Sequence, residues 1–173
     1  NYAEGIYVGY KFYETAAEEG LIKYEDMVQY PFGYGLTYGK ISYSGAKTEQ
    51  ETSAVLDDVT VCTKVKNESA YPLHESVEVY VKYKNAQPGE PGFQLKGIAC
   101  VELQAGEEKE VSVTLHARDF AVITEDGGCV VRPGEYEISI GGQQPGERSR
   151  ALTGRETEIL TVRKEGNEEN VEY

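Results

Sequence analysis

The chain has 173 residues and a formal net charge of −13 at pH 7, with 30 acidic against 17 basic residues. Nucleic-acid binding is not expected, because phosphate recognition needs clustered Lys and Arg and the sequence has no such cluster. It also has no run of about 18 apolar residues, so no membrane-spanning helix is expected. The chain begins at Asn1 with residues that have the character of mid-domain sequence, and we therefore expect a longer parent protein.

Residues 1–44 are rich in aromatic side chains and include a polar stretch, residues 14–25, that predicts a helical turn or a loop. The aromatic residues are Tyr7, Tyr10, Phe12, Tyr13, Tyr30, Phe32, Tyr34 and Tyr38. Exposed together, such side chains would promote aggregation. We expect either that another part of the parent protein covers them or that they fold onto the domain that follows.

Residues 31–38 (PFGYGLTY) alternate glycines with aromatic residues. Glycine gives the backbone conformational freedom, and aromatic rings supply a large apolar area. The pattern predicts a close-packed turn where the chain leaves one structural layer for another.

Several stretches beyond residue 54 alternate apolar and polar residues. They are residues 59–65, 77–83, 111–115 and 136–140. Alternation places one face on a core and the other in water, as in an antiparallel sheet. Residues 95–103 predict another strand, and residues 156–162 predict a last one. Residues 45–54 are polar and predict a linker or an early edge strand.

Turn-forming clusters of Gly, Pro, Asn and Asp separate these strands, and no long helical period lies between them. Short strands at this spacing predict a β-sandwich. The end of the chain, residues 163–173, is polar and acidic, and we predict that it is disordered.

Six short blocks occur in an order and spacing that resemble glycoside hydrolase family 3, which includes β-glucosidases, β-xylosidases and β-N-acetylhexosaminidases. The blocks are residues 4–13, 31–38, 95–97, 101–107, 117–120 and 133–136. The resemblance implies that residues 1–44 end an α/β-sandwich domain. It also implies that residues 45–162 form an immunoglobulin- or fibronectin type III-like antiparallel β-sandwich, so the chain is mainly β.

The sequence departs from the family pattern at three places. Lys11 stands where the family usually has Arg, no Trp occurs near Val130, and residues 143–173 have no counterpart that we can match.

The resemblance implies a parent that hydrolyses terminal β-linked glucosyl or related sugars with retention of configuration. Such chemistry needs two carboxyl groups about 5–5.5 Å apart. In this family the nucleophile is an Asp of a barrel domain, and the acid/base lies upstream of the blocks found here. Adjacent acidic pairs such as Glu18-Glu19 and Asp57-Asp58 are no substitute, because neighbours on a strand point to opposite faces. We expect no catalytic residue here and an inactive chain.

The aromatic blocks suggest a rim for the substrate of the parent enzyme. Tyrosine and phenylalanine can stack on sugar rings, and Tyr7, Tyr10, Phe32 and Tyr34 belong to the domain that carries the acid/base in the family. We name them as candidate rim residues. The Pro- and Gly-rich loop of residues 84–94 is a second candidate border of the substrate entrance.

No cofactor or metal site is expected. Cys62, Cys100 and Cys129 are widely spaced, which favours buried free thiols over a disulfide framework and weakly favours a cytoplasmic location, without excluding export of the parent. His74, placed in a loop, and His116 have no nearby residues at metal-ligand spacing.

We interpret the chain as a non-catalytic C-terminal part of a family 3 glycosidase that stabilises the assembled enzyme. Its expected partners are the barrel and α/β domains, the glycoside substrate through them, and, as a further possibility, a second copy of itself. The alternative interpretation is a stand-alone β-sandwich module that binds a carbohydrate or a protein.

Overall fold

The computed structural model describes residues 5–35, 37–88, 90–124 and 127–172. In chain order the elements are α1 (Tyr10–Glu18), α2 (Tyr24–Met27), β1 (Ile41–Thr48), β2 (Thr52–Ala54), β3 (Val59–Asn67), β4 (Leu73–Tyr83), β5 (Gln94–Leu103), β6 (Glu108–Leu115), the 3₁₀ helix η1 (Ala117–Phe120), β7 (Val122–Ile123), β8 (Cys129–Val131), β9 (Gly134–Gly141), α3 (Glu147–Thr153), β10 (Glu158–Glu165) and β11 (Glu169–Asn170).

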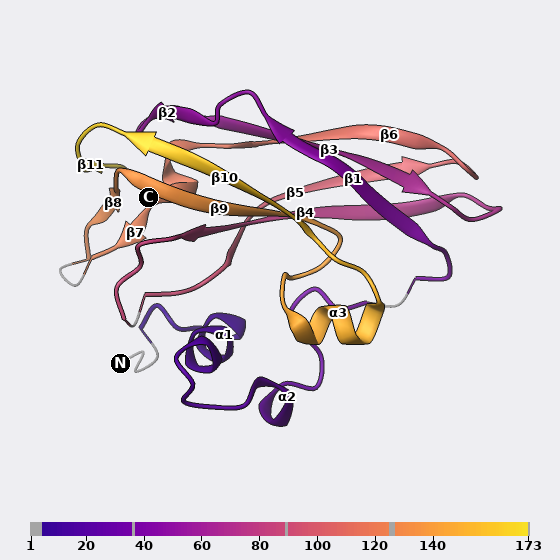
Figure 1. Cartoon of the computed structure of the whole chain (residues 1–173), viewed down its shortest axis with the longest axis horizontal. Helices are drawn as coiled ribbons and strands as arrows, with labels where there is room; N and C mark the ends of the chain where they lie inside the picture. The colour runs from indigo at the N-terminus through magenta and orange to yellow at the C-terminus, as the bar shows by residue number, and fades with distance from the viewer. Residues whose placement is uncertain (1–4, 36, 89, 125–126, 173) are drawn as a thin grey trace.

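The strands form a β-sandwich (Figure 1). One sheet has the order β1-β3-β6 and the other the order β2-β10-β9-β4-β5, while the short strands β11-β8-β7 make a small sheet at one end. Strand pairing is antiparallel except between β10 and β2. The expected mainly β, antiparallel sandwich is confirmed.

The core lies between the two sheets and contains the apolar residues of the alternating stretches. Its fully or nearly fully buried members include Val59, Val61, Val65, Val77, Val79, Val113, Leu115, Tyr136, Ile138 and Ile140. The strands β3 and β6 bury every second residue, as a sheet with one solvated face requires. Each buried Val or Ile contributes about 1.5–3 kcal/mol relative to an exposed one.

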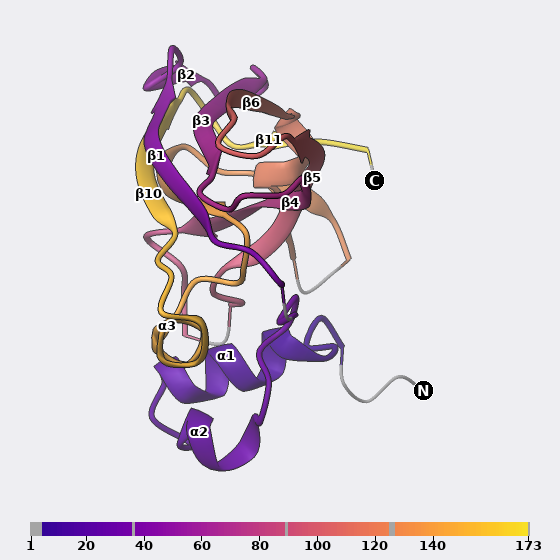
Figure 2. The ribbon, with the colours of Figure 1, turned by 90° about the vertical axis from the view of Figure 1, so that its right-hand side faces the viewer.

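The three helices form a layer at the lower edge of the sandwich (Figures 1 and 2). The sequence predicts a helical turn or a loop for residues 14–25. Most of this stretch is helical, because it contains the end of α1 and the start of α2. Gly20, with a φ of 71°, ends the first of these helices in the left-handed region that glycine adopts readily. Among the described residues, no helix has the length and apolar character needed to cross a membrane.

The sandwich begins earlier than expected. Ile41, the first residue of β1, is buried and pairs with Asn67 of β3, so residues 41–44 are part of the sandwich. Of the two forms predicted for residues 45–54, the edge strand is observed, as the second half of β1 followed by β2.

The prediction of a disordered tail is wrong for residues 163–172. Strand β10 continues to Glu165, and β11 pairs with β8 through Glu169 and Val131. Lys164 is 1% exposed, and its ammonium donates to the carbonyl oxygens of Ala54 and Asp57. The aliphatic stem of a lysine can be buried when the charged end finds acceptors, which the polar composition of this stretch did not reveal.

The prediction of buried cysteines is also wrong. Cys100 is exposed and Cys62 and Cys129 are half-buried, although all three are free thiols as expected. Cys62 and Cys100 occupy outward positions of β3 and β5, where alternation turns the side chain away from the core. His74 lies in β4 and not in a loop, because that strand starts directly after Pro72.

Candidate functional site: the interface between the helical segment and the sandwich

The outward face of β4 is covered by the helical segment, defined here as residues 5–35. Tyr80 points to this face and is fully buried, because the ring of Tyr10 lies across it edge-on at 6.5 Å between centroids. Tyr10 in turn stacks on Phe32 at 4.6 Å, and its hydroxyl accepts the backbone N–H of Leu95 at 2.8 Å. Aromatic pairs of this geometry each contribute about 0.5–1.5 kcal/mol beyond the area that they bury.

The loop after β9 fastens the helical segment to the sandwich through Gln144. This side chain is 1% exposed. Its Oε1 accepts the backbone N–H of Phe32 at 2.9 Å, and its Nε2 donates to the carboxylate of Glu14. Both ends of a buried amide therefore have partners in the helical segment, as burial of a polar group requires.

Gly33 allows the segment to approach β4 closely. Its φ is +73°, which side chains larger than hydrogen rarely adopt. A Cβ at this position would lie 2.8 Å from Oε1 of Glu78, whereas a Cβ at Gly35 would meet no atom within 4 Å. The close-packed turn predicted for this motif is observed, and it depends on the first of its two glycines.

Three carboxylates lie in or beside the interface. Glu78 accepts a hydrogen bond from the hydroxyl of Tyr80 at 2.7 Å. Glu75 accepts one from the hydroxyl of Tyr43 at 2.8 Å and pairs with Arg155 at 3.3 Å. Burial raises the pKa of Glu75, of Glu78 and of Glu14 above the usual range of a glutamate. These carboxylates are held by neighbouring side chains of the fold.

Sequence reasoning missed this cluster because β4 was treated as having one solvated face. The available signal was Tyr80 itself. A large aromatic residue among the polar positions of a strand indicates that the second face is covered.

The chain is similar in sequence and in structure to parts of known proteins. Residues 75–144 match the family described as Fibronectin type III-like domain. Over 145 residues the chain is 37% identical to an exo-α-(1→6)-L-arabinopyranosidase of Bifidobacterium longum, covering 82% of this chain and 17% of that protein. Over 141 residues it is 37% identical to the thermostable β-glucosidase B of Acetivibrio thermocellus, covering 81% of this chain and 18% of that protein.

A solved structure extends the similarity into the helical segment. The crystal structure of a GH3 β-glucosidase from Bifidobacterium adolescentis superposes with a TM-score of 0.75 at 32% identity, over 94% of this chain and 21% of that one. The chain is a homologue of the C-terminal, fibronectin type III-like part of glycoside hydrolase family 3 enzymes. It carries the fibronectin type III-like part of that family and spans 17–18% of the length of the two curated relatives.

The four candidate rim residues fall into three places. Tyr10 and Phe32 come together in the stack described above. Tyr34 is half-buried and stacks on Tyr30 at 4.8 Å, while Tyr7 is half-buried near the start of the segment. Tyr10 is used in packing, and Phe32 remains 44% exposed.

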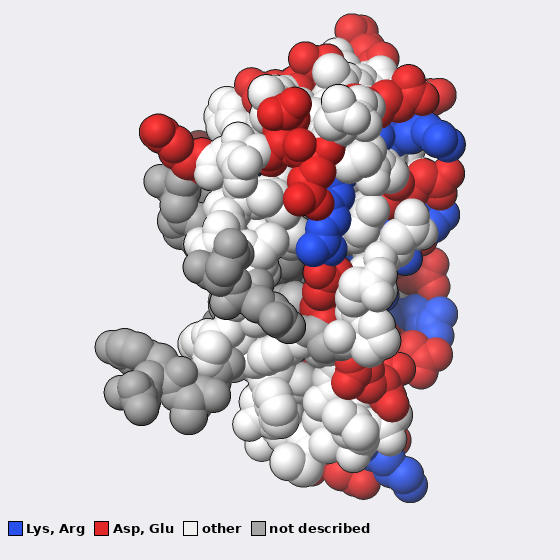
Figure 3. Space-filling model, turned by 90° about the vertical axis from the view of Figure 1, so that its left-hand side faces the viewer, with Lys and Arg blue, Asp and Glu red and all other residues white. Residues whose placement is uncertain are grey.

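The helical segment exposes several large apolar side chains. Phe12, Leu21, Met27, Tyr30 and Phe32 are between 44% and 72% exposed. A groove of about 440 Å³ runs between α1 and the stretch that follows α2, lined mainly by aromatic side chains. On the face of the molecule shown in Figure 3, acidic side chains crowd the sandwich, whereas the helical layer below it is largely uncharged.

The described part of the loop of residues 84–94 packs back onto the molecule. Glu90 pairs with Arg132 at 2.6 Å, and the N–H of Gly92 donates to the hydroxyl of Thr15 in α1 at 3.4 Å. Gly89 lies outside the described residues.

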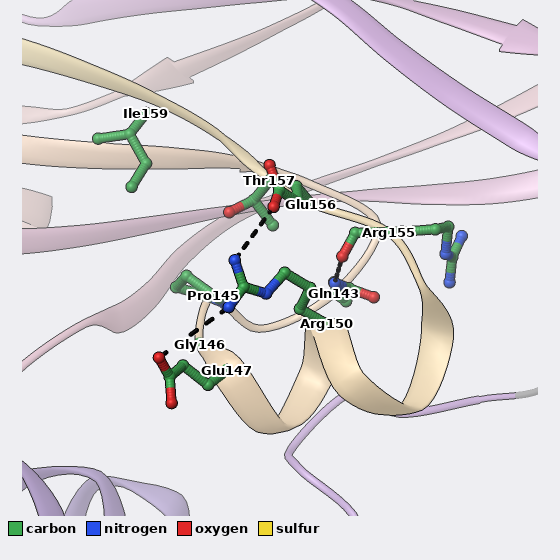
Figure 4. Close-up of a pocket in the computed structure, with 9 residues that line it drawn as sticks. All are labelled: Gln143, Pro145, Gly146, Glu147, Arg150, Arg155, Glu156, Thr157 and Ile159. Carbon is green, nitrogen blue, oxygen red and sulfur yellow. Dashed lines mark hydrogen bonds and ion pairs between the residues drawn. The ribbon is translucent and has the colours of Figure 1, made fainter.

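A second hollow of about 290 Å³ lies between α3 and β10 (Figure 4). Arg150 crosses it and pairs with Glu156 at 3.3 Å and with Glu147 at 4.0 Å, while Arg155 turns away toward Glu75. Its charges are therefore matched within the chain.

Across residues 5–35, 37–88, 90–124 and 127–172, no group of His, Cys, Asp and Glu is arranged to hold a metal ion. His116, which sequence reasoning left alone, lies 2.9 Å from the carboxylate of Asp58.

Proposed function

We propose that this chain is a non-catalytic part of a family 3 glycosidase and that it stabilises the assembled enzyme. The parent would hydrolyse terminal β-linked glucosyl or related sugars with retention of configuration. The observation that carries the proposal is the group of large apolar side chains exposed on the helical segment, which is attached to a sandwich that is crowded with acidic side chains on the face shown in Figure 3.

Two features support a docking role for this surface. Its aromatic groove is lined only by residues of the helical segment and opens to solvent, so a neighbouring domain can reach it. The segment is also fixed to β4 by the stack on Tyr80 and by Gln144, so a domain that docks on it becomes coupled to the sandwich. Exposed apolar area of this kind is typical of an interaction surface. We propose that the remaining α/β domain covers it, with the segment up to about residue 40 being the last part of that domain.

We further propose that Phe32 and Tyr34 border the substrate entrance of the parent. Both flank Gly33, which holds them at a fixed place relative to the sandwich. In the loop of residues 84–94, Glu90 and Gly92 are bound to the rest of the molecule. These contacts support a structural role for this part of the loop rather than a role as a mobile border of the substrate entrance.

The test uses the full-length parent enzyme. Met27→Ser on the helical segment is compared with Ile159→Ser on β10, because the two side chains have nearly equal exposure, 56% and 57%. We expect the first variant to lower the thermal midpoint of the enzyme and the second to leave it almost unchanged. Equal effects of the two variants would contradict the docking role.

Two further measurements separate the remaining claims. The 173-residue chain alone should release no p-nitrophenol from p-nitrophenyl β-glucoside, and measurable turnover that persists on further purification would contradict the non-catalytic role. Retardation of the chain in polysaccharide-containing native gels would instead favour the stand-alone binding module. In the parent, Phe32→Ala should raise KM if the rim assignment holds, whereas a change in stability alone would contradict it.

A further inference from the structure

A separate cavity of about 330 Å³ lies between the start of the helical segment, β5 and the β7–β8 hairpin. Three cationic side chains line it, Lys11 from α1, Lys96 from β5 and Arg118 from η1, together with Glu90 and Gln94. Ile6 and Val122 contribute apolar wall. Three cations around one hollow are unexpected in a chain with a formal net charge of −13.

These three cations also lack partners among the residues that the structure describes. Most other Lys and Arg residues of the described chain take part in an ion pair or a side-chain hydrogen bond. Within the described ranges, the side chains of Lys11, Lys96 and Arg118 have neither. Lys23 and Lys66 have none there either, but both are exposed and lie outside this cavity.

Two carboxylates of the described residues lie in or next to the cavity, and both already have partners. Glu90, which lines it, binds Arg132 at 2.6 Å and accepts the N–H of Gln87 at 2.9 Å. Asp119, beside Lys96 in an adjoining hollow, accepts the N–H of His116 at 2.8 Å. Counted over the described residues, the cavity therefore keeps an excess of positive charge.

The state of Lys96 agrees with this excess. Burial, and after it the charge of Lys11, lower the pKa of its ammonium, while Asp119 acts in the opposite direction. An anion placed between Lys11 and Lys96 would raise the pKa of the Lys96 ammonium, because an opposite charge within about 4–6 Å favours the charged form.

We propose that this cavity binds a small oxyanion, a phosphate or carboxylate group carried by a molecule no larger than a monosaccharide. The volume is at the lower end of the range of small-molecule sites, about 300–1,000 Å³. Apolar walls strengthen the attraction of the three cations for such a group. The negative charge of the rest of the chain acts weakly here, because salt screens charges beyond about 8 Å at physiological ionic strength.

The experiment titrates the 173-residue chain with inorganic phosphate at constant ionic strength, with glucuronate as a second probe, and follows backbone amide shifts by NMR. We expect saturable shifts confined to the residues that line the cavity. Lys96→Gln should weaken binding by about tenfold to a hundredfold, because it removes a charge-assisted hydrogen bond to the anion. The control is Lys66→Gln, which removes an unpartnered lysine outside the cavity and should leave the affinity unchanged.

The same oxyanion chemistry could come from a free molecule or from an acidic side chain of a neighbouring domain. Saturable phosphate binding that persists in the full-length parent assigns the site to a free anion. Binding to the chain that is lost in the parent assigns it to a carboxylate of that parent. Shifts that do not saturate, or equal affinity of the Lys96→Gln and Lys66→Gln variants, would overturn the proposal.

Discussion

Replacing Gly33 by Ala tests how the helical segment is held on β4. At a φ of +73° a residue with a Cβ costs about 1–2 kcal/mol. The new Cβ, 2.8 Å from Oε1 of Glu78, would also displace a carboxylate that accepts a hydrogen bond from Tyr80. Alanine also restricts the unfolded chain more than glycine does, which offsets about 0.4–1 kcal/mol of this cost. We expect docking of the segment to be weakened by about 1–3 kcal/mol.

The assay is native-state hydrogen exchange of the Phe32 amide, which donates to Gln144 only while the segment is docked. Since about 1.4 kcal/mol corresponds to a factor of ten, this amide should exchange roughly tenfold to a hundredfold faster in Gly33→Ala. Gly35→Ala is the matched control, because its Cβ would meet no atom within 4 Å. Equal protection of the Phe32 amide in the two variants would refute the reasoning.

Three further outcomes are expected. Asn67→Ala should lower the free energy of unfolding in urea by about 3 kcal/mol, because Nδ2 of this buried side chain lies 2.8–3.3 Å from three carbonyl oxygens, and a loss under 1 kcal/mol would contradict the assigned network. Burial raises the pKa of Glu14 and Glu78, so protonation favours the docked state and docking should weaken as pH rises through the raised pKa values. Protection of the Phe32 amide, corrected for intrinsic exchange, should therefore fall with rising pH. The variant Glu78→Gln should show a weaker dependence on pH. The same slope in this variant as in the unchanged chain would contradict the role assigned to Glu78. Lys164→Ala should cost about 2 kcal/mol of stability in thermal melts, whereas an unchanged melting temperature would mean that its two backbone acceptors are satisfied by water.

The sandwich could be predicted because its strands obey a local rule. Val59, Val61 and Val65 follow a period of two, and their burial depends only on which face of the strand they occupy. The turn at Gly33 was predictable for a similar reason, since a glycine between large rings indicates close approach of the backbone.

The interface could not be predicted, because it depends on residues far apart in the sequence. Glu78 in a strand has the appearance of a solvated position until the helical segment covers it. Lys164 likewise belongs to a polar stretch, and its burial depends on carbonyl groups of the turn after β2. The cationic cavity brings together Lys11, Lys96 and Arg118 from three separate elements, a grouping that spacing along the chain does not reveal.

The bond between the Phe32 amide and Gln144 also constrains the order in which the molecule is made. The two residues are 112 positions apart, so a ribosome adding about 5–20 residues per second needs roughly 6–22 s to supply the second partner after the first. During this interval the helical segment has left the ribosome without its anchor on the sandwich. A nascent chain that stops before the loop after β9 never acquires that anchor.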